Sequence, residues 1–421
     1  MLDRTKAPDF QLIKSHKLPE INTQKLRNSI SFHQLNTKNQ PVLGFQIAFE
    51  AGRCQENKTG EASFMAKMLL EGTTTHTGKQ IADKISFYGA SINIDSGNDF
   101  TIVSFYTLEK HLESLLPLLK EILQEPTFPQ SELDNLKNRS VQNLKIQEER
   151  TAYRATVKLK EVLFQENHPY SASSSEESIR AIQRQDLINF YENNIKSNPF
   201  EAYLVGDIDV DSEKLITDFI NSFEVDITKK DKQLIENPTN SVTKIYEEIE
   251  GSVQTSIRIG RLLFNQKHQD YVAFKVMNMI LGGYFGSRLM QNIREDKGYT
   301  YGISSRTAAM KNGSYFVIGT DVKKEIYGDA VNEIYKEIER LKNEPVSEEE
   351  LENVKNYMSG NFLGSLSTAF AVMDKVQDIH LYNLDESFYN DYITKLRKVT
   401  VEQVQKMAQK YLIDLTEVCI G

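Results

Sequence analysis

The residues best suited to metal or acid–base chemistry, the histidines, are few and widely scattered in this sequence. None of them has the HxxxH or HxxEH spacing that would place two imidazoles on one face of a helix. The seven are His16, His33, His76, His111, His168, His268 and His380. Each is therefore expected to be a surface or turn residue rather than a metal ligand.

A serine–lysine pair offers a second possible chemistry. Ser63 and Lys67 are four residues apart in a segment with helical periodicity, so they would share one face of a helix. A lysine amine beside a serine hydroxyl can activate that hydroxyl as a nucleophile. The spacing differs from the SxxK of penicillin-recognising enzymes, and a polar pair on a helix surface is the favoured interpretation.

Three other polar features have simpler structural explanations. Residues 95–99 (DSGND) resemble part of a calcium loop but lack its terminal glutamate, and their place between two strand-like runs predicts a hairpin turn. The basic cluster 229–232 (KKDK) is expected to be a solvated linker rather than an anion site. Cys54 and Cys419 form no CxxC pair, which indicates a reducing compartment.

Composition excludes several classes of protein. The 421 residues contain 50 Lys and Arg against 59 Asp and Glu, and the net charge of −9 argues against a nucleic-acid-binding protein. An apolar content of 39% excludes intrinsic disorder, and no apolar run is long enough to cross a bilayer. Residues 1–8 lack an apolar signal core, so we expect a cytoplasmic protein, or a periplasmic one if a signal peptide has been removed.

The chain contains a long internal repeat. Residues 131–138 (SELDNLKN) match 349–356 (EELENVKN), and further matches in the same order have offsets between 210 and 219 residues. They pair 64–72 with 274–282, 182–190 with 399–407, and 203–206 with 418–421. A drifting offset is what loop-length changes in a duplicated domain produce. The repeat predicts two homologous domains, 1–227 and 246–421, joined by a polar linker at 228–245.

Periodicity predicts the same kinds of element in both halves. In the first half, strands are expected at 42–51 and 100–107 and helices at 60–70, 80–87 and 108–124, followed by one long helix from Gln130 to about Phe164. In the second half, strands are expected at 256–260, 300–308 and 313–321, and helices at 271–281, 328–342 and 348–365. The predicted fold class is α+β, with a mostly antiparallel sheet in each domain and helices packed on one face.

One segment of the second half carries a family resemblance. Residues 282–289 read GGYFGSRL, and residues 293–302 continue as IREDKGYTYG. This pattern resembles the second-domain signature of the pitrilysin/insulinase superfamily of zinc metallopeptidases, in the branch that includes mitochondrial processing peptidase. The internal repeat and the length of each half agree with the resemblance, which covers essentially the whole chain.

The resemblance also identifies where zinc chemistry should be. Active members of the family carry His-x-x-Glu-His on the helix that corresponds to 60–70, where two histidines bind zinc and the glutamate is the general base. Those three positions are Ser63, Ala66 and Lys67 in this sequence, and the aligned position of the third ligand is Asn143. A hydroxyl, a methyl, an ammonium and an amide do not form a zinc site, so no metal is expected in this chain.

Arg294 and Tyr301 match a second pair of functional residues in the family. They are seven residues apart, on either side of a turn expected at Gly298. The resemblance implies that Arg294 binds a substrate carbonyl or carboxylate and that Tyr301 donates its hydroxyl to the oxyanion formed during peptide hydrolysis. The structural alternative is that Arg294 pairs with an acidic neighbour, Glu295 or Asp296, and that Tyr301 packs against a strand.

These observations lead to one favoured hypothesis and two alternatives. The favoured one is a non-catalytic subunit of a heterodimeric zinc peptidase, inactive alone, whose homologous partner subunit carries the zinc and whose peptide substrate binds in extended form along a sheet edge. The first alternative is a structural or binding scaffold, like the core subunits of the respiratory cytochrome bc1 complex. The second is an orphan enzyme that uses Ser63 and Lys67.

Overall fold

A computed structural model describes residues 5, 11–38, 41–166, 168–226, 228, 235–236, 238–239 and 242–421. The basic cluster predicted at 229–232, and much of the predicted linker around it, lie outside these residues. In the part of the chain that is described, no helix is long and apolar enough to cross a lipid bilayer.

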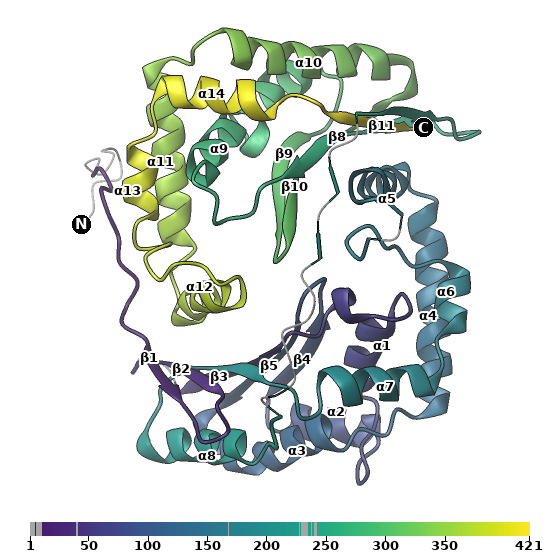
Figure 1. Cartoon of the computed structure of the whole chain (residues 1–421), viewed down its shortest axis with the longest axis vertical. Coiled ribbons are helices and arrows are strands. Elements are labelled where there is room, and N and C mark those ends of the chain that lie inside the picture. Colours follow the sequence, from purple (N-terminus) through teal and green to yellow (C-terminus); the bar gives the residue numbers. More distant parts are fainter. Residues whose placement is uncertain are drawn as a thin grey trace. The chain divides into compact units, whose positions relative to one another are not determined.

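The first sheet has six strands in the order β1-β2-β6-β3-β5-β4 (Figure 1). These strands are β1 (Asn22–Lys25), β2 (Ser31–Asn36), β3 (Val42–Phe49), β4 (Ser91–Ser96), β5 (Thr101–Leu108) and β6 (Phe200–Gly206). Every second residue of β5, beginning at Thr101, is buried, because alternate side chains of a strand point to opposite faces of the sheet. Phe45 of β3 pairs with Phe105 of β5 on the buried face.

The second sheet repeats this topology with five strands in the order β7-β11-β8-β10-β9. They are β7 (Lys244–Glu247), β8 (Gln254–Leu263), β9 (Ile303–Met310), β10 (Gly313–Lys323) and β11 (Thr416–Ile420). In this sheet β11 pairs in parallel with β7 and antiparallel with β8. In the first sheet β6 takes the same place, since it pairs in parallel with β2 and antiparallel with β3. The shared order confirms the internal repeat and the predicted α+β class.

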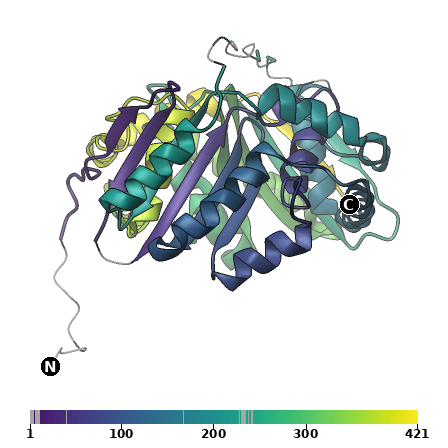
Figure 2. The same ribbon diagram turned by 90° about the horizontal axis from the view of Figure 1, so that it is seen from below.

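Helices cover one face of the first sheet. The helical segments of this half of the chain are η1 (Arg53–Gln55), α1 (Glu61–Met68), α2 (Gly78–Phe87), η2 (Glu109–His111), α3 (Leu112–Gln124), α4 (Gln130–Glu148), α5 (Thr151–Phe164), α6 (Glu176–Ala181), α7 (Arg184–Asn194) and α8 (Val210–Asn221). One of them, α5, packs instead against β11 of the second sheet. α3 and α8 lie side by side over the sheet, as the view in Figure 2 also shows. The predicted leucine stripe of α3, from Leu112 to Leu123, is buried against this sheet.

The prediction of one long helix from Gln130 to about Phe164 was wrong. Arg150 has an extended backbone, with φ −87° and ψ 118°, and separates α4 from α5. No proline or glycine marks the break, so the sequence pattern does not show it. The two helices pack against different elements: α4 packs against α1 and α6, whereas α5 packs against β11. This tertiary packing overrides the continuous helical propensity of the segment.

The second half adds a corresponding set of helices. They are α9 (Tyr271–Asn278), two short π-helical segments η3 (Met279–Gly283) and η4 (Met290–Asp296), η5 (Lys324–Ile326), α10 (Tyr327–Asn343), α11 (Glu348–Gly364), α12 (Ala369–Leu381), α13 (Tyr392–Arg397) and α14 (Val401–Tyr411). α9 packs against α14 and, through an edge-to-face contact of Phe274 and Phe316, against β10.

The described chain forms two compact units, and each draws on more than one segment. One unit comprises residues 11–19, Leu263–Thr307 and Phe316–Ile413, and the other comprises Glu20–Leu262, Ala308–Tyr315 and Asp414–Gly421. The 308–315 segment is the tip of the β9–β10 hairpin.

Polar contacts attach this hairpin tip to the first half of the sequence. Buried Asp99 accepts a hydrogen bond from the Tyr170 hydroxyl at 2.6 Å and another from the backbone N–H of Lys311 at 3.0 Å. The Tyr170 oxygen accepts from the backbone N–H of Asn312 at 3.1 Å. The hairpin turn predicted at 95–99 is present, since Gly97 N–H donates to the Phe100 carbonyl, but Asp99 has this further role.

Candidate functional site

The sequence predicts a degenerate zinc site on α1, and this helix is firmly anchored. It begins after Gly60, whose φ of +103° lies in the left-handed region that favours glycine. The Glu56 carboxylate accepts hydrogen bonds from the backbone N–H groups of Gly60 and Ala62 at 2.9 and 3.0 Å. Burial raises the pKa of Glu56 above its usual value, and these hydrogen bonds oppose the shift. Phe64 and Met65 are buried in the core below.

The four candidate positions carry side chains that do not suit zinc. On α1, Ser63 is half-buried, Ala66 is 1% exposed and the Lys67 side chain is exposed, while Asn143 is exposed on α4, which packs against α1. A hydroxyl, a methyl and an amide provide no thiolate, imidazole or carboxylate ligand, and the ammonium of Lys67 repels a cation. Among the described residues, no group of three or more His, Cys, Asp or Glu side chains is placed to hold a metal ion.

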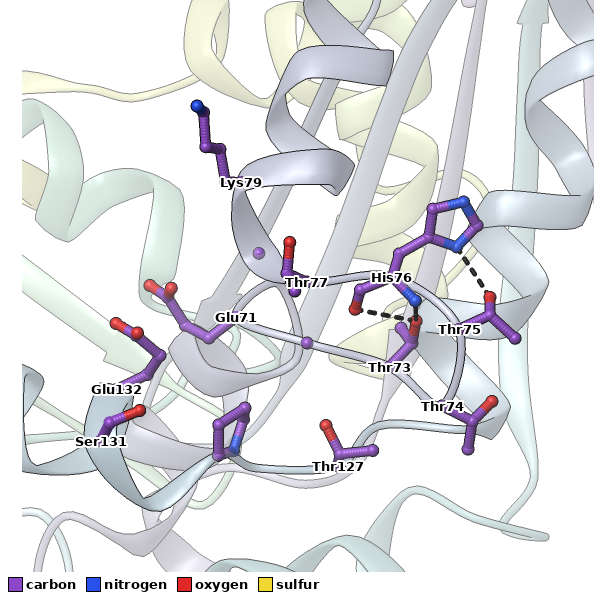
Figure 3. A pocket seen from close by; sticks show the side chains of 13 residues that line it. Glu71, Thr73, Thr74, Thr75, His76, Thr77, Lys79, Thr127, Ser131 and Glu132 are labelled. Carbon is purple, nitrogen blue, oxygen red and sulfur yellow. Dashed lines mark hydrogen bonds between the residues drawn. The ribbon is translucent and has the colours of Figure 1, made fainter.

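A polar pocket of about 540 Å³ lies beyond the end of α1 (Figure 3). Its walls are formed by the loop that joins α1 to α2 and by the start of α4. The charged groups on these walls are the carboxylates of Glu71 and Glu132 and the ammonium of Lys79. In Figure 3 the His76 side chain points toward Thr75, away from these two carboxylates. The pocket therefore has mixed charge and no set of converging ligands.

The loop beside this pocket is held by Glu121 of α3. Its carboxylate accepts hydrogen bonds from the hydroxyls of Thr73 and Thr75 and from His76 Nδ1, the last at 3.0 Å. Partial burial acts to raise the pKa of Glu121, but these donors outweigh it and lower the pKa to about 2. We interpret this cluster as a structural clamp on the loop.

The second-domain signature forms a rigid framework in the structure. A Cβ atom on Gly282 would lie 2.7 Å from the Ser305 Oγ and 2.8 Å from the Ser305 backbone nitrogen, so only glycine allows η3 to approach β9 this closely. Arg288 is 11% exposed and donates from Nε and Nη2 to the two Glu350 oxygens at 2.9 and 2.8 Å. This bidentate pair connects the signature to α11 and holds the pKa of Arg288 above its usual value.

Arg294 lies on η4 with its guanidinium over an aromatic ring. Its Cζ is 4.9 Å from the centre of the Phe285 ring, and Nη1 is 3.8 Å from a Glu295 oxygen. The Arg294 side chain is 35% exposed and Phe285 is 63% exposed. The ion pair expected from the structural alternative is thus present, but it is long and open to water, where such pairs contribute little. The guanidinium remains accessible to an incoming ligand.

Tyr301 lies in the turn that leads from η4 into β9. The turn passes through Gly298, whose φ is +64°, as the sequence predicts. Tyr301 is 97% exposed, so the alternative in which it packs against a strand is wrong. A large aromatic side chain that buries almost no surface adds little to the stability of the fold.

The structure also shows residues whose contacts the sequence analysis did not predict. His33 is 1% exposed in β2 and lies between the Thr23 hydroxyl, 2.9 Å from Nδ1, and Glu201, 3.0 Å from Nε2, so its expected place on the surface or in a turn was wrong. The available signal was the strand-like run around it, 30–35 (ISFHQL), which mixes apolar and polar residues. Phe285 stands in the signature segment, but its contact with Arg294 was not predicted. Glu350 carried no signal, because its partner Arg288 lies 62 residues away.

The fold and the site together define a metallopeptidase-like protein whose zinc positions are lost. A family model described as insulinase (peptidase family M16) matches residues 34–173, and one described as the peptidase M16 inactive domain matches residues 181–358. The chain therefore belongs to peptidase family M16, as an inactive-type homologue by its zinc positions.

Relatives and solved structures agree with this assignment. The chain is 23% identical over 407 residues to the non-peptidase homolog YmxG of Helicobacter pylori, covering 92% of this chain and 93% of that protein. It is 24% identical to the probable inactive metalloprotease YmfF of Bacillus subtilis, and the match covers 86% of this chain and 89% of that protein. A crystal structure of a peptidase M16 inactive domain from Pseudomonas fluorescens superposes with a TM-score of 0.87 at 26% identity, and the match covers 96% of this chain and 98% of that chain.

Proposed function

We propose that this protein is the non-catalytic subunit of a heterodimeric zinc peptidase and contributes Arg294 and Tyr301 to the active site of its partner. The observation that carries the proposal is the exposure of this pair in a chain whose zinc positions are Ser63, Ala66 and Lys67. Tyr301 is 97% exposed and the guanidinium of Arg294 is accessible, so both can reach a substrate outside this chain.

The two side chains have complementary tasks in this proposal. The fork of Arg294 suits a substrate carbonyl or carboxylate, because its N–H groups can donate two parallel hydrogen bonds. The phenol of Tyr301 suits the oxyanion that forms on the scissile carbonyl, since a donor aimed at developing charge stabilises the transition state more than the substrate. In this proposal the zinc of the partner subunit would supply the activated water.

The test requires the complex. This chain is co-expressed with the M16 chain of the same organism that carries an intact His-x-x-Glu-His motif, and the complex is assayed with a library of fluorogenic peptides. Tyr301→Phe is expected to lower kcat/KM by about 10²-fold or more, the usual loss for one oxyanion donor, with the zinc content of the complex unchanged. Arg294→Gln is expected to raise KM. Tyr357→Phe, at another exposed tyrosine (42%), is the matched control.

Two outcomes would contradict the proposal. Chelator-sensitive cleavage by the isolated chain would show that it is an enzyme in its own right. Full activity of a complex that carries both Tyr301→Phe and Arg294→Gln would favour the scaffold alternative, in which this chain supports its partner without touching the substrate.

A further inference from the structure

The near-complete exposure of Tyr301 raises the question of what fixes its position. With 97% of its surface in water, its side chain gains almost no orientation from packing. An oxyanion donor is effective only when it is already in place before the reaction, and a displacement of about 1 Å can cost about 10² in rate. The backbone turn at residues 300–302 must therefore supply the order that the side chain lacks.

The Thr300 hydroxyl holds this turn together. It accepts a hydrogen bond from the Gly302 backbone N–H at 3.1 Å, which closes a short turn with Tyr301 at its tip. It also donates to the Asp321 carbonyl of β10 at 2.8 Å, so the turn is attached to the neighbouring strand.

A second hydroxyl completes the network from the strand side. Thr320 of β10 is 3% exposed, and its hydroxyl lies 2.9 Å from the Thr300 hydroxyl and 3.0 Å from the Gly302 carbonyl. One consistent arrangement has Thr320 donating to Thr300, and Thr300 donating to Asp321. The Thr300 hydroxyl in the turn and the Thr320 hydroxyl on β10 thus hold the residues on both sides of Tyr301, while the Tyr301 side chain is left free to meet a ligand.

We propose that Thr300 is a positioning residue for Tyr301, with Thr320 as its support. This inference rests on the proposed function, because it concerns the geometry of the same site. Loss of the Thr300 hydroxyl leaves the Tyr301 phenol chemically intact but allows its turn to move. The effect falls on the transition state, where the donor must be aligned, more than on substrate binding.

The experiment compares Thr300→Val, which keeps the shape and removes the hydroxyl, with Thr300→Ser, which keeps the hydroxyl. In the heterodimeric complex, Thr300→Val is expected to lower kcat by about 10- to 100-fold with KM nearly unchanged, and Thr300→Ser to restore most of the rate. Adding Thr300→Val to Tyr301→Phe is expected to cost little more than Tyr301→Phe alone, because both changes remove the same interaction.

A readout that does not depend on activity accompanies the kinetics. Amide hydrogen exchange of the peptide covering 299–303 in the isolated chain is expected to rise in Thr300→Val and to stay near the wild-type rate in Thr300→Ser. Faster exchange with an unchanged kcat would overturn the positioning role while leaving the proposed function intact. An unchanged kcat in Tyr301→Phe would overturn both.

Discussion

The buried Tyr170 hydroxyl provides a sharp test of how the hairpin tip at 308–315 is held. Tyr170 is 1% exposed, donates to the Asp99 carboxylate at 2.6 Å and accepts from the Asn312 N–H at 3.1 Å. Tyr170→Phe removes both bonds and leaves a backbone donor unpaired. A hydrogen bond to a charged group contributes about 1.5–3 kcal/mol and a neutral one about 1 kcal/mol, so the expected loss is about 2.5–4 kcal/mol.

Tyr191→Phe is the matched control for this substitution. Tyr191 is 3% exposed, and its hydroxyl makes one neutral hydrogen bond, to the Leu123 carbonyl at 2.9 Å. Removal of this hydroxyl is expected to cost about 1 kcal/mol. Because the sequence has no tryptophan, unfolding in urea is best followed by circular dichroism.

Hydrogen exchange separates the local effect from the global one. The chain has two compact units, so its unfolding need not be a single transition. Exchange of the peptide that covers 308–315 is therefore measured as well, and it is expected to accelerate in Tyr170→Phe by about tenfold for each 1.4 kcal/mol lost. Equal costs for the two substitutions, or unchanged exchange at 308–315, would refute the assigned role of the Asp99–Tyr170 network.

Three further predictions concern other parts of the chain. Burial is the main cause, and the charge of Asp99 the second, that raises the pKa of the Cys54 thiol to about 12. Cys54 should therefore react slowly with a disulfide reagent at pH 8 in the wild type and faster in the Asp99→Asn variant, as measured by mass spectrometry. The pKa of Glu121 is lowered to about 2 from an ordinary 4.5, so the stability that its ionised form contributes is complete above about pH 4.5 and is lost as the pH falls toward 2. The Glu121→Gln variant should therefore show a smaller drop in Tm between pH 5.5 and 3.5 than the wild type. Phe285→Ala removes the ring under Arg294, a contact of about 0.5–1 kcal/mol, and should raise the KM of the complex about two- to fivefold, whereas Phe285→Tyr should not.

Much of the fold follows from local patterns in the sequence. The strands predicted at 42–51 and 100–107 are β3 and β5, and the helices predicted at 328–342 and 348–365 are α10 and α11 within one or two residues. These elements have strong periodicity and recognisable ends. The boundary at Arg150 has no such mark, because it results from where α4 and α5 pack rather than from the residues at the break.

The site was predictable only in part, for a similar reason. Arg294 and Tyr301 stand in a short motif, so their positions can be read from the sequence alone. Part of the support of that motif is non-local: Glu350 of α11 pairs with Arg288, and Thr320 of β10 reaches the turn of Tyr301 from another strand. Such contacts depend on tertiary structure, which residue spacing does not reveal.

Retention of a motif is weak evidence for function when the motif also supports the fold. Gly282 allows η3 to approach β9, and Arg288 is a nearly buried partner of Glu350, so both would be needed in a protein with no substrate at all. Arg294 and Tyr301 differ from them. Among the residues that the structure describes, Arg294 makes a 3.8 Å ion pair and a ring contact, and Tyr301 is 97% exposed. Substituting either one should therefore leave the Tm nearly unchanged, since exposed positions contribute little to stability. If Tyr301→Phe or Arg294→Gln lowered the Tm by several degrees, their presence would be explained by folding, and the argument for a shared active site would lose its foundation.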